Sequence, residues 1–249
     1  MSQVRLYSLI SVLIVSLISL IGVITLGIKI EKLKKILLFF VSFSAGALFG
    51  DVFIHLLPQT IVEGIITVKA SLCILAGILF GLITEKVIHW NHCHMPITKT
   101  HVHPFAIMNL VGDAVHNFID GLILGASYLV SIPVGIATTI AIIFHEIPQE
   151  IGDFGVLIHG GFSKKKALLV NFMTALTAIV GVIIALLLTR YINNLTSYLI
   201  PFAAGSFIYI AGSDLIPELH KENKFSQIIG QLLFFLFGIG VMLLLLVLE

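Results

Sequence analysis

Long apolar segments, separated by short polar stretches, run through the whole chain. Eight of these segments are long enough to cross a membrane, near residues 6–28, 36–57, 64–84, 105–129, 133–159, 166–189, 197–217 and 226–248. An α-helix needs about 20 residues to span about 30 Å of hydrocarbon. Each segment is continuously apolar, without the alternation of barrel strands, so helices are favoured. The pattern predicts an all-α integral membrane protein, a single polytopic domain over residues 1–249.

Composition and charge narrow the class of protein further. Hydrophobic residues make up 58% of the chain and charged residues 11%, with a mean hydropathy of +1.12. About a quarter of a typical soluble chain is charged, so an ordinary soluble domain is excluded and the lipid bilayer is the expected partner. The formal net charge of +1 leaves no basic surplus for binding nucleic acid, which is therefore excluded as a main function.

The basic residues are concentrated in alternate loops. If the N-terminus lies outside, every Lys and Arg except Arg5, Lys69 and Arg190 falls in a loop on the inner side. This is the distribution that the positive-inside rule describes. We therefore expect both termini to be extracytoplasmic and the histidine-rich residues 86–104 to form a cytoplasmic loop. No signal for an organelle is visible, so we expect the cell membrane, plasma or inner.

A faint internal repeat links the second and seventh segments. Residues 43–46 (FSAG) and 202–205 (FAAG) lie 159 residues apart, and the same offset superposes residues 55–58 (HLLP) on residues 214–217 (DLIP). Because these two segments run in opposite directions, the repeat predicts that spans 1–3 are inverted onto spans 6–8 around spans 4 and 5. Chance and shared membrane-helix composition remain alternatives.

Acidic residues without counterions mark the fourth and fifth segments. No Lys or Arg occurs between Lys99 and Lys164, yet five of the thirteen acids do. In the fourth segment one helical face carries Asn109, Asp113, His116, Asn117 and Asp120. In the fifth segment one face carries His145, Glu146, Gln149, Glu150 and Asp153. An unpaired charge at membrane depth costs at least about 2.5–3.5 kcal/mol. The neutralising charge must therefore be protons or an ion from outside.

The ligand chemistry of these two faces suits a divalent metal. Imidazole, carboxylate and amide oxygen are ligands of Zn²⁺, with Fe²⁺, Mn²⁺ and Cd²⁺ as alternatives. His116 and Asp120 are i, i+4 neighbours, so they can converge on one ion. Pro148 removes one backbone hydrogen bond inside the fifth segment and frees a carbonyl near Phe144. The alternative is that the polar side chains only hold helices together. Five acids without a cation argue against it.

Residues 116–121 (HNFIDG) and 145–154 (HEIPQEIGDF) closely resemble the paired signature of the ZIP (Zrt-, Irt-like) family of divalent metal transporters, in its histidine-rich branch. The resemblance implies eight helices in a 3+2+3 arrangement, a metal site between the central helices that is often binuclear, and a homodimer. By motif position it implies a transport site of His116, Asp120, His145 and Gln149. It further implies a neighbouring site of Asn117 and Glu146 with Asp120 and Gln149 shared and Glu150 close by. Gln149 departs from the usual histidine, which puts metal preference and the second site in question.

Two other functions use similar residues. An intramembrane zinc-dependent hydrolase needs His-Glu-x-x-His on one helix, but Gln149 stands where the second histidine is required. A proton-coupled carrier of organic solutes also uses carboxylates, although it does not need the His/Asn/Asp set. We therefore expect a transporter of divalent cations, most of all Zn²⁺ into the cytoplasm, and not an enzyme.

Further polar residues lie outside the two central segments. Histidines flank Cys93 in the predicted inner loop, which suggests a cytosolic metal acceptor or sensor, or else only a solvated loop. The pairs Asp51/His55 and Asp214/Glu218 have i, i+4 spacing, and we expect them to line the ends of the pathway. Glycines spaced by four residues in spans 2, 3 and 4 predict close helix packing.

Overall fold

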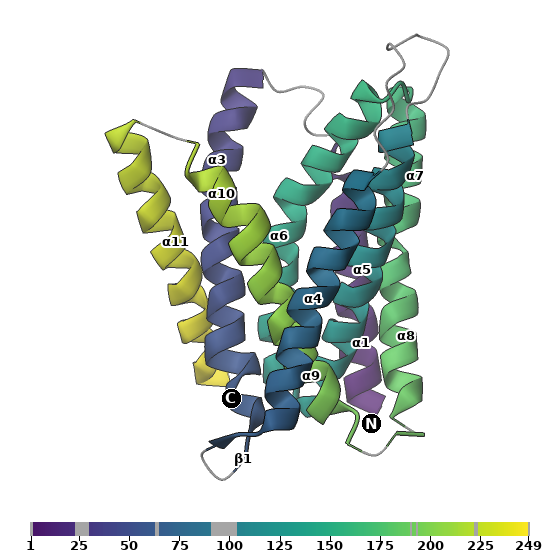
Figure 1. Cartoon of the computed structure of the whole chain (residues 1–249), viewed down its shortest axis with the longest axis vertical. Helices are drawn as coiled ribbons and strands as arrows, with labels where there is room; N and C mark the ends of the chain where they lie inside the picture. Colours follow the sequence, from purple (N-terminus) through teal and green to yellow (C-terminus); the bar gives the residue numbers. More distant parts are fainter. Residues whose placement is uncertain are drawn as a thin grey trace.

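The computed structural model of the chain describes residues 2–22, 30–62, 65–90, 104–189, 191–192, 194–221 and 224–248. Over these residues, eight helical segments are long and apolar enough to cross a membrane, which confirms the predicted all-α membrane class (Figure 1). They are Gln3–Ile21, Leu37–Thr60, Val68–Lys86, Ala106–Val130, Ile132–Ile158, Lys164–Leu188, Thr196–Leu219 and Phe225–Leu245.

Several spans are built from more than one helical element. The first half of the chain contains α1 (Ser2–Ile18), η1 (Ser19–Ile21), α3 (Ile30–Gly50), η2 (Asp51–Leu56), η3 (Pro58–Thr60), β1 (Ile61–Val62), β2 (Ile65–Ile66), α4 (Val68–Trp90) and α5 (Pro104–Val130). The second half contains α6 (Ile132–His159), α7 (Lys164–Ala175), α8 (Thr177–Leu188), α9 (Thr196–Tyr209), η4 (Ile210–Leu215), α10 (Ile216–Leu219), α11 (Phe225–Leu245) and η5 (Leu246–Leu248).

Two features of the spans differ from the hydropathy prediction: the start of the third span and the continuity of the sixth. The third span begins at Val68 because the β-branched run before it forms a small antiparallel hairpin, with Ile61 opposite Ile66 and Val62 opposite Ile65. The sixth span is divided at Leu176 into α7 and α8. Hydropathy could not foresee either feature, since the residues concerned are as apolar as a helix interior.

The helices α5 and α6 form the centre of the bundle. They pack against each other, and α5 also contacts α4, α8 and α9, while α6 also contacts α1, α3 and α7. The α5–α8 contact is close because a Cβ atom on Gly121 would overlap the carbonyl oxygen of Ala178, and one on Gly181 would overlap that of Phe118. The pairs α3–α11 and α4–α9 meet in the same way through Gly46 and Gly238, and through Gly77 and Gly205.

The two halves of the chain share a local irregularity. Each contains a π-helical turn, η2 (Asp51–Leu56) in span 2 and η4 (Ile210–Leu215) in span 7, and the 159-residue offset of the sequence repeat superposes one on the other. Each turn is followed two residues later by a proline, Pro58 or Pro217, which lacks the N–H that a regular helix would use. The α3 and α9 helices run in opposite directions (Figure 1), as an inverted repeat requires.

Both ends of the chain lie at the same end of the bundle. Figure 1 shows N and C at the end where β1 lies, while α10 lies at the opposite end. In the same view α5 runs from the α10 end toward the hairpin, and α6 returns. Residues after Asp120 in α5 and before His145 in α6 therefore lie closer to the hairpin end than these two residues do.

Candidate metal centre

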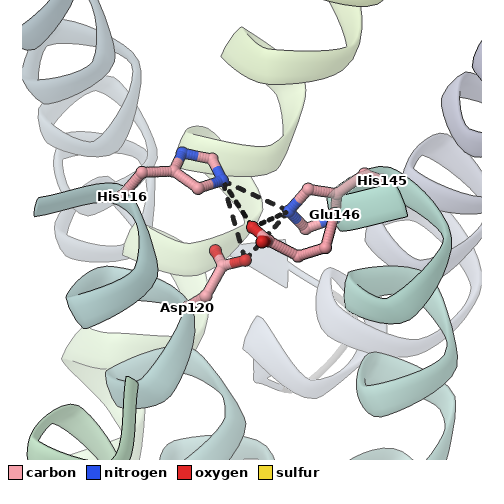
Figure 2. Close-up of side chains that lie close together, drawn as sticks. All are labelled: His116, Asp120, His145 and Glu146. Carbon is pink, nitrogen blue, oxygen red and sulfur yellow. Dashed lines mark hydrogen bonds and ion pairs between the residues drawn. The ribbon is translucent and has the colours of Figure 1, made fainter. Parts of the chain in front are cut away.

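The helices α5 and α6 bring four ionisable side chains together in the middle of the bundle (Figure 2). These are His116 and Asp120 from α5, and His145 and Glu146 from α6; we call them the tetrad. One ligand atom from each lies within 4.8 Å of the others. The spacing in sequence explains this convergence, since His116 and Asp120 are one helical turn apart on the face that α5 presents to α6.

Distances within the tetrad match those that a tetrahedral ion requires. His145 Nε2 lies 2.9 Å from Asp120 Oδ2, and His116 Nε2 lies 3.4 Å from Glu146 Oε1. The two Nε2 atoms are 3.3 Å apart, and the two remaining His–carboxylate distances are each 3.7 Å. Ligands about 2.1 Å from a tetrahedral Zn²⁺ are about 3.4 Å from one another. Small side-chain adjustments would therefore place all four atoms around one ion.

A backbone contact orients one of the two imidazoles. His145 Nδ1 lies 3.1 Å from the carbonyl oxygen of Ala141, and because a carbonyl only accepts, the ring must donate there. This leaves Nε2 unprotonated in the neutral ring and directed at the tetrad, as in protein metal sites. The ring edge also packs on Phe207, with the two centroids 5.6 Å apart.

The tetrad is largely buried, and no Lys or Arg of the described residues pairs with it. Asp120, His145 and Glu146 are at most 2% exposed, whereas the side chain of His116 is 18% exposed. Asp120 Oδ2 and Glu146 Oε1 accept no hydrogen bond within the described part of the chain. In those same residues, every ion pair of the tetrad joins a histidine to a carboxylate, and none joins the tetrad to a Lys or Arg. Within the described part of the chain, two buried carboxylates thus face two imidazoles and no Lys or Arg.

The other predicted site residues lie beside the tetrad. Asn117 donates through Nδ2 to Asp113, 2.8 Å from Oδ1 and 3.2 Å from the carbonyl oxygen. Gln149 lines a cavity together with His116. Glu150 accepts a hydrogen bond from Asn171. Their assignment as metal ligands stays a prediction.

The freed carbonyl predicted beside Pro148 has a partner. Ser44 of α3 donates through Oγ to the carbonyl oxygen of Phe144, the group that residue 148 would bind in an uninterrupted helix. The helix α6 continues across Pro148, which also lines the cavity. The Ser44 side chain on α3 thus replaces the backbone hydrogen bond that Pro148 cannot donate to the carbonyl oxygen of Phe144.

Sequence reasoning missed a polar face on the sixth span. Thr174 donates through Oγ1 to Asp113 Oδ2, and Asn171 donates to Glu150. Thr177 donates to the carbonyl oxygens of Ala114 and Thr174 at 2.7 and 2.6 Å. The spacing of residues 171, 174 and 177 was the available signal, since steps of three place them on one helical face.

A cavity of about 360 Å³ connects the tetrad region with the α10 end of the bundle. His116 and Gln149 line its inner part, and its acidic lining residues are Glu85, Asp113, Asp153, Asp214 and Glu218. Among the described residues, no Lys or Arg lines it. Such a surface attracts cations.

The two pairs predicted to line the ends of the pathway, Asp214/Glu218 and Asp51/His55, differ in position. Asp214 and Glu218 line the cavity. Asp51 and His55 are instead buried in η2, at most 1% exposed, where His55 Nε2 lies 3.0 Å from the carbonyl oxygen of Met242. The histidine-rich segment of residues 91–103, with its predicted sensor role, lies outside the described residues.

Comparison with known proteins finds sequence matches over most of the chain. A sequence model described as "ZIP Zinc transporter" matches residues 2–105 and 92–246. Zinc transporter zipt-7.2 of Caenorhabditis elegans is 44% identical over 149 residues, covering 58% of this chain and 32% of that protein. Zinc transporter ZIP10 of Mus musculus is 37% identical over 161 residues, covering 61% of this chain and 19% of that protein. The matches thus span a third or less of these two relatives.

A more complete alignment is found with Zinc transporter ZIP13 of Danio rerio. It is 31% identical over 269 residues, which cover 86% of this chain and 76% of that protein. The family match extends over nearly the whole chain, and it agrees with the eight membrane-spanning helices. The chain belongs to the ZIP zinc transporter family.

Proposed function

We propose that this multi-pass membrane protein transports divalent metal cations, with Zn²⁺ as its principal substrate, through the tetrad between α5 and α6. The observation that carries the proposal is the tetrad itself: two imidazoles and two carboxylates, buried at the centre of the bundle without a Lys or Arg ion pair among the described residues. Such a set is costly unless a cation occupies it. The family membership and the zinc transporters among the relatives support zinc as that cation.

The cavity suggests how an ion leaves the tetrad. His116 is the tetrad member that also lines the cavity, so it is the ligand that solvent reaches first. From His116 toward the α10 end, the acidic residues that line the cavity can each bind the cation weakly in turn. On the hairpin side the core is closed by apolar residues such as Ile123, Leu124 and Ile142, each at most 2% exposed. The conformation described is therefore suited to exchanging metal with one side only.

We assign the α10 end to the cytoplasm and both termini to the outside. The distribution of Lys and Arg between the loops supports this orientation. With that orientation, the cavity opens to the cytoplasm, which is the side where the metal would be released during uptake. Fe²⁺, Mn²⁺ and Cd²⁺ are further candidate substrates, because the same ligand types bind them.

Uptake of ⁶⁵Zn²⁺ into proteoliposomes that contain the purified chain tests the proposal. We expect saturable uptake that Asp120→Ala abolishes, while His220→Ala, an exposed histidine outside the tetrad, transports like the unaltered protein. Both variants are checked for folding by size-exclusion chromatography. Absence of uptake by the unaltered protein, or full uptake by Asp120→Ala, would overturn the assignment of the tetrad as the transport site.

A further inference from the structure

A second group of oxygen atoms lies next to the tetrad, where α5 and α6 meet α7. Thr174 Oγ1 donates to Asp113 Oδ2, and Asn171 Nδ2 donates to Glu150 Oε2. Asn171 and Thr174 are one helical turn apart, so the two carboxylates face the same turn of α7. Glu150 is also subject to the charges of Asp113, Glu146 and Asp153.

Two buried oxygen atoms in this group have no hydrogen-bond partner. Asn171 is fully buried and Glu150 is 1% exposed. Within the residues that the structure describes, neither Asn171 Oδ1 nor Glu150 Oε1 is bound by a donor. Since Asn171 Nδ2 contacts Glu150, the oxygen of the same amide lies at the edge of the same group. Native structures rarely leave such atoms unsatisfied, and binding of a cation is one of the ordinary explanations.

We propose that Asp113, Glu150 and Asn171 form a second divalent-cation site, made of oxygen ligands alone, which receives the ion on its way from the tetrad to the cavity. In this last respect the inference rests on the proposed function. Asn171 Nδ2 now bonds to Glu150, the carboxylate that the cation would neutralise. Rotation of the Asn171 amide would exchange the positions of Nδ2 and Oδ1 and so turn Oδ1 toward the cation. Thr174 is a positioning residue, which holds Asp113 by its hydroxyl.

This site differs chemically from the tetrad. Carboxylate and amide oxygens suit harder ions such as Mn²⁺ and Mg²⁺, and they bind Zn²⁺ less strongly than a site with two imidazoles. Asp113 lines the cavity, so water can complete the coordination there. The site also differs from the neighbouring site that the motif implies, because its third ligand comes from α7 rather than from Asn117 or Gln149.

Electron paramagnetic resonance of Mn²⁺ tests the proposal in detergent-purified protein. The His116→Ala/His145→Ala double variant lacks the imidazoles of the tetrad. We expect this variant to retain one Mn²⁺ whose spectrum shows no coupling to imidazole nitrogen. That property separates the site from the histidine-rich segment of residues 91–103. Adding Asn171→Leu should weaken this binding by at least about 10-fold.

Matched variants separate coordination from packing. Thr177→Val removes a hydroxyl from the same polar face, but this hydroxyl bonds to the backbone carbonyls of Ala114 and Thr174, so Mn²⁺ binding should not change. Asn171→Asp adds a negative oxygen ligand and should tighten Mn²⁺ binding, with a larger rise of melting temperature on Mn²⁺ addition than in the parent. A folded Asn171→Asp variant with unchanged or weaker Mn²⁺ binding would overturn the site.

The two proposals fail in different ways. If the unaltered protein transports zinc but the double variant retains no oxygen-coordinated Mn²⁺, the second site is wrong and the transport function stands. If the double variant retains this Mn²⁺ and Asn171→Leu loses it, the second site stands, even where zinc uptake by the unaltered protein is absent.

Discussion

The two sides of the tetrad along α5 and α6 differ in charge and in packing. Toward α10, Asp113 and Asp153 line an acidic cavity. Toward the hairpin, the same two helices carry Ile123, Leu124 and Ile142, which are almost completely buried. One helix pair thus combines an acidic surface that lines a cavity with an apolar, close-packed one. The difference shows that the surroundings of a buried polar cluster can make it accessible from one side and not from the other.

Loss of a tetrad ligand should have the largest effect. His145→Ala removes an imidazole that is buried and oriented by the Ala141 carbonyl, so zinc affinity should fall by at least about 100-fold. Competition against a chelating fluorophore measures it. His220→Ala is the control, because that histidine is exposed. Unchanged affinity in folded His145→Ala would contradict the account.

Thiol labelling should distinguish the two sides directly. In a background in which Cys73 and Cys93 are replaced by Ser, Gln149→Cys places a thiol on the cavity wall, and Ile142→Cys places one in the closed side. A charged, water-soluble maleimide should label residue 149 at least about 10-fold faster, because residue 142 is buried among apolar groups. Equal rates would mean that the hairpin side is also open.

Close packing on the hairpin side of the tetrad should contribute measurably to the free energy of unfolding. Gly121→Leu forces a side chain against the Ala178 backbone and should destabilise the fold by at least about 1–3 kcal/mol. Gly152→Ala is its counterpart in α6, where a Cβ atom meets nothing within 4 Å. It should leave stability unchanged or raise it by about 0.5–1 kcal/mol. Thermal unfolding in detergent compares the two, and similar melting temperatures would refute the packing difference.

The smallest expected effect concerns metal preference on the open side. Gln149→His replaces an amide by an imidazole on the cavity wall near His116. Because imidazole suits Zn²⁺ better than the harder Mn²⁺, the ratio of zinc to manganese uptake should rise several-fold. Competition of unlabelled Mn²⁺ with ⁶⁵Zn²⁺ in proteoliposomes measures the ratio. An unchanged ratio would show that Gln149 does not touch the ion.

Sequence alone predicts the central helices well because their signal is strong. Eight long apolar runs require membrane helices, and two polar faces without a Lys or Arg lead directly to α5 and α6. The 159-residue repeat is also matched by the two π-helical turns η2 and η4.

Features that depend on neighbouring helices were harder to predict. Asn171 and Thr174 share a short polar face of an otherwise apolar span, and only packing shows that they contact Glu150 and Asp113. Asp51 and His55 have the spacing of pathway residues, yet the π-helical turn buries them against α6 and α11. Spacing defines a helical face, whereas the fold decides what that face contacts.

The most direct test of the central claim is the position of bound zinc. Anomalous diffraction at the zinc absorption edge, from crystals grown with Zn²⁺, locates the ion without reference to transport. The account predicts a peak within about 2.0–2.2 Å of ligand atoms of His116, Asp120, His145 and Glu146. A zinc-loaded crystal with no peak among these four side chains would contradict it.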